Sequence, residues 1–407
     1  MLNVVSAVQA EQIIAAHLPQ CNNKQTVPLM EGIGLVCAET IYSAENIPPF
    51  DRSTVDGFAV RARDTYGCSQ TIPAMLRLRA EILMGTAAIA PLQAGECQKI
   101  PTGGMLPVGA DAVVMHEYCE NYEDGFIYVG KPCGVFENIT RKGDDVKTGQ
   151  LVLQKGAVIT SRTIGQLAAL GIAKVCVYKP IRVGILSTGD EIVPYDIVPP
   201  VGCVRDINSA LLTATVKECA ADVKCYPIVK DEKPLLLQAV EKAVAENDVV
   251  LLSGGSSAGD RDAANAVLGQ LGQVFFHGIA IKPGKPTLFA EIQNKPVFAL
   301  PGHPLAAALV CRLFVLPALC AIQGTKYSPI VLYAKIKTNI PSDNGREEVI
   351  PVQIAYEKND IFARPVFVKS GVISVLNKAD GYIQIERDSE GVNQNETVKV
   401  YMFARNV

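Results

Sequence analysis

The stretch RVGILSTGDE, residues 182–191, joins an apolar run to a polar turn built around a glycine. The apolar part has the length and composition of a strand that is buried on both faces. The turn places Ser187, Thr188, Gly189 and the acidic Glu191 directly beyond that strand. In an open parallel sheet, ligands bind beyond the carboxyl ends of the strands. The stretch therefore predicts an α/β sheet with a ligand site at its edge.

Strand and helix patterns alternate on the carboxyl side of this stretch. They predict strands at 224–229, 248–252 and 297–300, and helices at 209–220, 233–246, 262–271 and after Pro304. Strands that alternate with helices form a mostly parallel, doubly wound sheet. We therefore expect an α/β domain at residues 181–325.

The flanking segments have other patterns. Residues 6–18 combine a Ser-x-x-Gln capping pattern with amphipathic spacing, and a helical pattern returns at 161–170. Between these helices, short apolar runs broken by glycine or proline indicate β structure, and strands resume after residue 323. These patterns predict a discontinuous domain (1–48 and 146–180), an inserted β domain (49–145) and a C-terminal β domain (326–407).

Composition limits the classes of protein. A chain of 407 residues is too long for one compact core, so roughly two to four domains are expected. The net charge is −3, and the absence of a long basic run argues against a nucleic-acid partner. We see no secretory signal and no apolar stretch close to the roughly 20 residues that span a bilayer. We therefore expect a cytoplasmic protein without a membrane partner.

The 12 cysteines are scattered, form no C-x-x-C pair and are accompanied by 4 histidines. Several lie in strand-like runs, where cysteine acts as a small apolar side chain. Reduced, buried thiols are favoured over a zinc site, whose ligand spacing is missing.

Three further turns carry candidate binding groups. Ser253, Gly254 and Gly255 close a predicted strand, and Asp262 precedes the next helix, whose N-terminus suits a phosphate. The alternative is a glycine turn that only backbone geometry requires. The stretch KPGKP, residues 282–286, has two prolines that limit the backbone and space two lysines around a glycine. A rigid lysine pair suits an oxyanion better than two lysines on a flexible loop would, and the alternative is a solvated turn with ordinary lysines. The stretch LPGHP, residues 300–304, indicates by itself only the start of a helix, because proline is common at the first helical position.

Two other patterns are less specific. The acids Asp56 and Asp145 lie in turns, where an aspartate is usually only a turn former. Residues 255–259, GSSAG, match the nucleophile elbow of the α/β-hydrolases, but two glycines and a serine separate Ser257 from the strand. We therefore favour a site for a phosphate-bearing anion and a divalent metal over a hydrolase.

Taken together, these motifs resemble the MoeA family, the molybdopterin molybdenumtransferases, to which the gephyrin E domain is related. The resemblance covers essentially the whole chain. It rests on PPFDRSTVDGFAVR (48–61), IPTGGMLPVGADAVVMHE (100–117) and STGDE (187–191), and on residues 206–210, 253–262, 280–286 and 300–304.

The resemblance implies an elongated homodimer of four-domain subunits, in which the α/β domain is MogA-like, the discontinuous domain dimerises and the C-terminal domain is β-barrel-like. It implies that molybdate, as substrate, is inserted into the dithiolene of adenylyl-molybdopterin with Mg²⁺-dependent release of AMP. The implied partners are a second subunit that shares the active site and the molybdopterin adenylyltransferase.

The family's functional residues can be carried over one by one. Its catalytic acids fall on Asp56, Asp145, Glu191, Asp231 and Asp262, and of these Asp231 and Asp262 are the Mg²⁺ ligands. Its substrate-binding residues fall on Thr102, Ser187, Thr188, Gly189, Ser253, Gly254, Gly255, Lys282, Lys285, Pro301, Pro304, Arg346 and Ser370.

The chain departs from the family at the loop that usually reads L-P-G-N-P-V-S. His303 replaces the asparagine, and Ala306 replaces the serine and cannot replace its hydroxyl. These changes leave open a tungstate-preferring paralogue or a catalytically weak scaffold. A nucleotide pyrophosphatase that acts on other dinucleotides is a further alternative.

Overall fold

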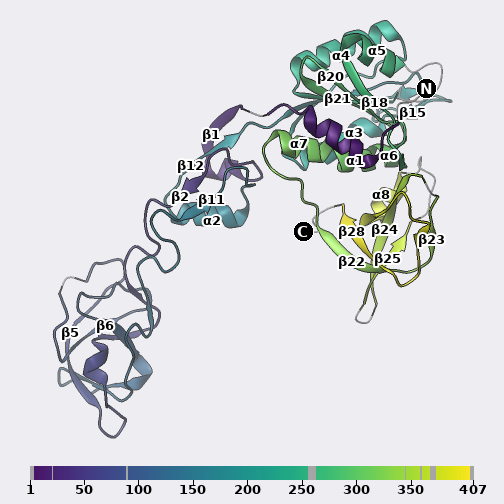
Figure 1. Cartoon of the computed structure of the whole chain (residues 1–407). Coiled ribbons are helices and arrows are strands. Elements are labelled where there is room, and N and C mark those ends of the chain that lie inside the picture. Colours follow the sequence, from purple (N-terminus) through teal and green to yellow (C-terminus); the bar gives the residue numbers. More distant parts are fainter. Residues whose placement is uncertain are drawn as a thin grey trace.

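The computed structural model describes residues 4–20, 22–88, 90–254, 263–343, 345–357, 360–366 and 373–403. The molecule is elongated: a large body at one end is joined through a narrow middle part to a smaller β body at the other (Figure 1). The chain passes from the middle part into the smaller body and returns, as expected for an inserted domain.

The large body is built on a six-stranded sheet in the order β16-β13-β17-β21-β20-β18. The first four of these strands are parallel. Strand β20 pairs antiparallel with β21, and β18 pairs antiparallel with β20. In sheet order the strands are Asp222–Cys225, Arg182–Ser187, Val249–Ser253, Lys295–Leu300, Leu288–Ile292 and Gln273–His277. The predicted mostly parallel sheet is confirmed.

Helices cover both faces of this sheet, because alternate side chains of each strand enter separate cores. Ile185 and Leu251 pack with α3, α6 and α7 on one face, whereas Leu186 and Leu252 pack with α4 and α5 on the other. The helices are α3 (Ile207–Lys217), α4 (Lys233–Glu246), α5 (Ala263–Leu271), α6 (Pro304–Val310) and α7 (Leu316–Ile322). The sheet is therefore doubly wound, as predicted.

Helices α6 and α7 are continuous through a π-helical turn, Cys311–Val315. The combined helix, Pro304–Ile322, is 19 residues long and apolar enough to span a membrane, but 78% of its apolar window is buried inside the protein. The expectation that no apolar stretch approaches this length was wrong. The helix has the burial of a core element, because it packs directly against the sheet.

The first helix, α1 (Ala7–Ala16), has the predicted capping box between Ser6 and Gln9. Its buried residues Ala10 and Ile14 join the core of the α/β domain, so α1 lies with that domain although we placed it in the discontinuous one. The amphipathic pattern predicts the helix but does not say which core it covers. The remaining boundaries stay predictions.

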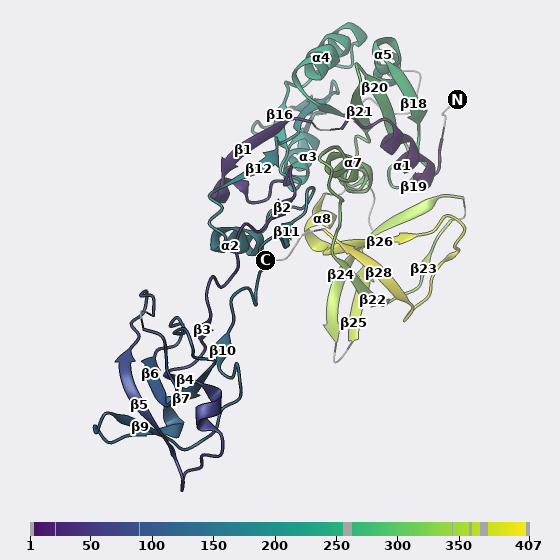
Figure 2. The same ribbon diagram turned by 60° about the vertical axis from the view of Figure 1, so that its left-hand side comes forward.

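The middle part and the β body contain only short elements. The middle part holds the antiparallel pairs β1–β12 and β2–β11, with helix α2 (Ser161–Ala169). Its strands are β1 (Lys24–Pro28), β12 (Lys174–Tyr178), β2 (Ile41–Tyr42) and β11 (Leu151–Leu153). Strands β3 (Arg52–Ser53) and β10 (Ile139–Thr140) pair where the chain enters and leaves the β body (Figure 2).

The β body is a six-stranded sheet in the order β7-β4-β6-β5-β9-β8. The strands in that order are Ala112–Met115, Gly57–Val60, Glu96–Ile100, Ala74–Glu81, Phe126–Val129 and Cys119–Asn121. Burial raises the pKa of the Cys97 and Cys119 thiols to about 12, so both are protonated at neutral pH.

The C-terminal domain is a closed barrel. Strands β24, β25, β22, β28 and β26 pair in that order, and β26 pairs in turn with β24, which closes the sheet. Its strands are β22 (Val331–Ile336), β24 (Glu347–Glu357), β25 (Asp360–Pro365), β26 (Gly381–Ile385) and β28 (Thr397–Met402). The short strand β19 (Ile281–Lys282) comes from the α/β part of the chain, yet it pairs in parallel with β24. This pairing joins the two domains where the candidate site lies.

Candidate functional site

The carboxyl ends of β13 and β17 meet at one edge of the sheet, where Ser187 and Ser253 are register partners. The backbone N–H of Thr188 donates to the Ser253 carbonyl at 2.9 Å. Gly254 has a φ of +100°, and a Cβ at this position would lie 2.2 Å from the Thr188 carbonyl oxygen. Only glycine fits there, so the predicted glycine turn brings two polar loops into contact.

Several side-chain oxygens that could bind a metal ion lie beside this turn. The Thr188 hydroxyl donates a hydrogen bond to the Asp231 carboxylate, and the Asp231 backbone N–H lies 3.3 Å from Asp190 Oδ1. Asp190, Glu191 and Asp231 are exposed at the rim. Aspartate oxygens are the donors that Mg²⁺ prefers, so the donor type fits. However, within the described ranges no group of three or more His, Cys, Asp or Glu side chains could hold a metal.

Two buried polar atoms at this edge have no partner in the described part of the chain: Ser187 Oγ and Asn208 Oδ1. The Asn208 side-chain amide donates to Ser253 Oγ at 2.7 Å and to the Gly302 carbonyl at 2.8 Å. Buried polar groups are normally satisfied, so such atoms at a sheet edge are available to a ligand. We did not predict Asn208 as a site residue. Two signals could have found it: its place in the first turn of a helix that Asp206 caps, and its place in residues 206–210, a stretch that carries the resemblance.

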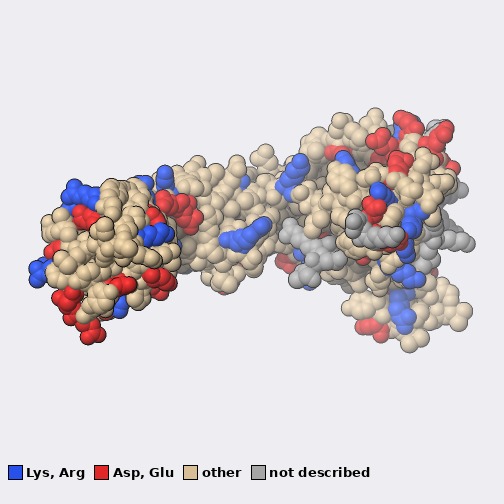
Figure 3. Space-filling view, turned by 90° about the horizontal axis from the view of Figure 1, so that it is seen from below, with Lys and Arg blue, Asp and Glu red and all other residues tan. Residues whose placement is uncertain are grey.

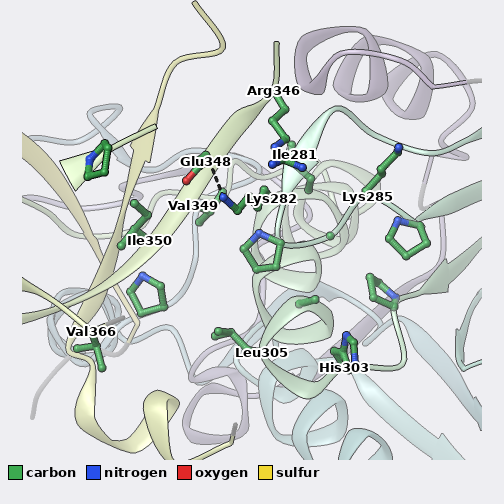
Figure 4. A pocket seen from close by; sticks show the side chains of 17 residues that line it. Ile281, Lys282, Lys285, His303, Leu305, Arg346, Glu348, Val349, Ile350 and Val366 are labelled. Atoms are coloured by element: carbon green, nitrogen blue, oxygen red, sulfur yellow. Dashed lines mark hydrogen bonds and ion pairs between the residues drawn. The ribbon is translucent and has the colours of Figure 1, made fainter. Parts of the chain in front are cut away.

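A cavity of about 810 Å³ lies between the α/β domain and the barrel (Figure 4). The predicted residues Lys282, Lys285, Pro301 and Arg346 line it. Pro304 does not line it, although its neighbours on both sides do. The rest of the wall is mostly apolar: Ile281, Pro283, Gly284, Pro286, Leu305, Ala306, Pro341, Val349, Ile350, Pro351 and Val366, with His303 and Glu348.

The turn that carries the two lysines is closely packed. Gly284 has a φ of +126°, and a Cβ there would lie 2.7 Å from both Ile281 Cδ1 and Val310 Cγ2. The glycine therefore lets the turn lie against the end of α6, at Val310, while both lysine side chains stay exposed.

Two of the three cavity cations, Lys282 and Arg346, are paired with acids that sequence reasoning missed. Lys282 Nζ lies 2.9 Å from Glu348 Oε1 and 3.5 Å from Asp343 Oδ2. Arg346 Nη2 lies 2.9 Å from the same Asp343 oxygen. Glu348 is the register partner of Lys282 across β19 and β24, a contact that no local sequence pattern reveals.

Three further predicted residues, Asp56, Thr102 and Asp145, lie away from the cavity. In the β body, Asp56 Oδ1 accepts from the Thr102 backbone N–H at 2.7 Å and from its hydroxyl at 3.1 Å. These hydrogen bonds lower the pKa of Asp56. Asp145 is exposed where the chain returns to the middle part, and its N–H donates to the Ile47 carbonyl at 3.0 Å. Within one subunit, the middle part separates these residues from the cavity (Figures 1 and 2).

Gly255, Asp262 and Ser370 lie outside the described residues, as does the elbow-like stretch 255–259. Their predicted roles, including the metal role of Asp262, stay predictions.

The fold and the site define a class: a multidomain α/β protein whose cavity suits an anionic ligand. Residues 5–171 match the MoeA N-terminal region (domain I and II), residues 184–321 the "Probable molybdopterin binding domain" and residues 333–403 the MoeA C-terminal region (domain IV).

Similar proteins agree with these matches. The molybdopterin molybdenumtransferase of Haemophilus influenzae is 33% identical over 97% of this chain and 98% of its own. The solved molybdopterin biosynthesis MoeA protein of Pyrococcus horikoshii is 32% identical, with a TM-score of 0.87 over 98% of this chain and 100% of that one. The molybdopterin molybdenumtransferase of Staphylococcus aureus is 31% identical over 93% and 90%. The chain belongs to the MoeA family.

Proposed function

We propose that this protein is a molybdopterin molybdenumtransferase. It inserts molybdate into adenylyl-molybdopterin, with Mg²⁺-dependent release of AMP. The observation that carries the proposal is the cavity itself, which places three cations, Lys282, Lys285 and Arg346, beside an apolar wall. A doubly charged oxyanion needs the cations, and a planar pterin suits the apolar wall.

The chain's own residues divide into two groups in this proposal. The polar turns at the sheet edge, residues 187–189 and 253–255, hold the phosphates in this proposal. The Ser187 and Ser253 hydroxyls supply the hydrogen-bond donors there, because the Thr188 and Gly189 N–H groups already donate to backbone carbonyls. Lys282, Lys285, Arg346 and Ser370 hold the molybdate, and Pro301 and Pro304 shape the loop between the two groups. Fixed cations aimed at developing negative charge lower a reaction barrier without reorganising during the reaction.

Asp231 and Asp262 would hold the Mg²⁺ ion, with Asp190 and Glu191 nearby. The bound ion would neutralise charge on the phosphoanhydride that is cleaved. The hydrogen bond from Thr188 orients the Asp231 carboxylate in this arrangement. The oxygen donors at the rim support the assignment by their chemical type.

The active site is shared between two subunits in this proposal, so that Asp56, Thr102 and Asp145 of one subunit complete the pocket of the other. Their distance from the cavity within one chain supports a shared site (Figure 1). The middle part, which is mostly uncharged apart from one patch of Lys or Arg on the face in Figure 3, exposes Met30, Ile33, Tyr42, Leu151 and Val158. Exposed apolar groups of this kind favour a dimer contact. We place this homodimer in the cytoplasm, where the molybdopterin adenylyltransferase would supply its substrate.

One experiment separates this function from its alternatives: AMP release from adenylyl-molybdopterin with Mg²⁺, measured with molybdate, with tungstate and with neither. A molybdenumtransferase releases AMP faster when molybdate is present. A scaffold releases none, and a general pyrophosphatase releases AMP without the oxyanion and also cleaves unrelated dinucleotides. A stronger response to tungstate would identify the tungstate-preferring paralogue, which His303 and Ala306 leave open.

A further inference from the structure

The two acids that pair with the cavity cations differ in burial and in attachment. The Glu348 side chain is 7% exposed, whereas the Asp343 side chain is 70% exposed. Glu348 lies within β24 and its strand partner is Lys282, so the 2.9 Å contact between them is fixed by the sheet. Glu348 therefore acts as a permanent anchor for the Lys282 ammonium group.

Asp343 is held differently. One of its carboxylate oxygens, Oδ2, lies 2.9 Å from Arg346 Nη2 and 3.5 Å from Lys282 Nζ. The two cations lower the pKa of Asp343, so it is ionised at neutral pH. Asp343 lies outside the strands, between β23 (Ile340–Pro341) and β24, so no ladder fixes it in the bridge.

A single carboxylate oxygen that contacts both cations takes the position that one oxygen of an anionic ligand would need. Exposed ion pairs contribute little free energy, so a competing anion can break these two contacts at small cost. A divalent tetrahedral oxyanion brings twice the charge of the carboxylate and more acceptor oxygens. A monovalent anion has no such advantage over Asp343.

We propose that the Asp343 carboxylate occupies the oxyanion's place on Lys282 and Arg346 and is displaced when a divalent tetrahedral oxyanion binds, so that Asp343 selects against weaker anions. Glu348 stays in place and keeps Lys282 positioned. The inference rests on the proposed function only for the assignment of these cations to an oxyanion, and it concerns binding rather than turnover.

The test is calorimetric titration of the full chain with sodium molybdate and with sodium sulfate, at low chloride and again at high chloride. Asp343→Asn is expected to bind both oxyanions about two- to fivefold more tightly at low chloride and to lose more affinity than wild type as chloride rises. Asp343→Ala is the second variant, should the first fold poorly. Asp343→Glu restores a carboxylate and should return the chloride response toward that of wild type.

A matched control removes the same charge from the same region. Glu347 neighbours Glu348 on β24, but it accepts from Gln384 at 2.9 Å and lines a different cavity. Glu347→Gln should leave oxyanion affinity and the chloride response unchanged. If Glu347→Gln or Glu348→Gln tightens binding as much as Asp343→Asn does, general charge explains the gain and the proposal is wrong.

The remaining outcomes are also decisive. Unchanged or weaker binding in both Asp343→Asn and Asp343→Ala overturns the proposal, and so does a wild-type chain that binds neither oxyanion. A wild-type chain that binds oxyanions and shows the Asp343 effect, yet releases no AMP from adenylyl-molybdopterin, refutes the proposed function while the inference stands.

Discussion

Asn208 Nδ2 lies 2.7 Å from Ser253 Oγ, and this hydrogen bond ties the first turn of α3 to the end of strand β17. The same amide group reaches the Gly302 carbonyl in the loop before the long helix. One buried side chain thus connects three segments that the sequence separates widely. The Asn208 Oδ1 atom is left for a ligand.

Asn208→Ala should destabilise the fold and also weaken nucleotide binding. The loss of two buried hydrogen bonds is expected to cost about 1–3 kcal/mol of unfolding free energy, measured by urea denaturation. Asn247→Ala is the control, because this buried asparagine also bonds two groups, Tyr226 Oη and the Ala243 carbonyl, at the start of β17 instead of its end. Both variants should lose stability, but only Asn208→Ala should lose AMP affinity. Equal AMP affinity in the two would remove Asn208 from the site.

Asp231→Asn should lower turnover strongly and stability little. Asp231 is exposed, so its charge contributes little to folding. Groups around a catalytic metal typically change activity by roughly 10- to 100-fold when replaced. Activity is the Mg²⁺-dependent AMP release, and stability is the melting temperature. Asp222→Asn, an exposed aspartate at the opposite end of β16, is the control and should alter neither. A variant that melts and turns over like wild type would contradict the role of Asp231.

The ionisation of Asp56 should depend on Thr102. Hydrogen bonds from Thr102 lower the pKa of Asp56, so Asp56 stabilises the folded state above its unfolded pKa and loses that effect as the pH falls through the folded value. Thr102→Val removes the hydroxyl donor and keeps the backbone N–H, so the pKa should rise toward its ordinary value. NMR titration of the Asp56 carboxyl group between pH 2 and pH 6 measures the change. An unaltered titration curve in Thr102→Val would show that the hydroxyl plays no part.

Ala306→Ser should strengthen oxyanion binding. Ala306 lines the cavity and has no hydroxyl, and one added hydrogen bond of about 1 kcal/mol corresponds to roughly fivefold in affinity. Molybdate titration measures the effect, and Ala308→Ser on the same helix, which does not line the cavity, is the control. If Ala306→Ser changes nothing, the oxyanion does not reach this part of the wall.

Mixed subunits test whether the active site is shared. Asp56→Ala and Lys285→Ala homodimers should each be inactive, because every pocket lacks one essential group. After subunit exchange, a heterodimer has one pocket with both defects and one with neither, so up to about half of the activity per heterodimer should return. Exchange of two differently tagged Lys285→Ala preparations is the control and should restore nothing. Absence of recovery in heterodimers of proven composition would refute the shared site.

The sequence predicts the elements well where local pattern determines them. Helix α4 spans the predicted residues 233–246, and strand β17, Val249–Ser253, lies within one residue of the predicted strand 248–252. The capping box at Ser6 also forms as predicted. These features depend on neighbours in the chain, which a pattern records.

Features that depend on distant contacts were not predictable in the same way. The position of α1 on the α/β core, the pairing of β19 with the barrel and the Lys282–Glu348 contact all join residues far apart in sequence. The two lysines were found from the KPGKP stretch, whereas Arg346 was found only as a single position in a resemblance to a family. Their acidic partners carry no local signal, because an acid in a strand or a turn is common.

The backbones of the two cavity lysines are hydrogen-bonded to different domains. Lys282 follows the barrel through its pairing with Glu348, whereas the Lys285 carbonyl accepts from Ile279 and Thr287 in the α/β part of the chain. A rotation of the barrel about this short strand therefore alters the separation of the two positive charges. The spacing between these ammonium groups would then depend on how the barrel is oriented on the α/β domain, and an anion that binds both would fix that orientation.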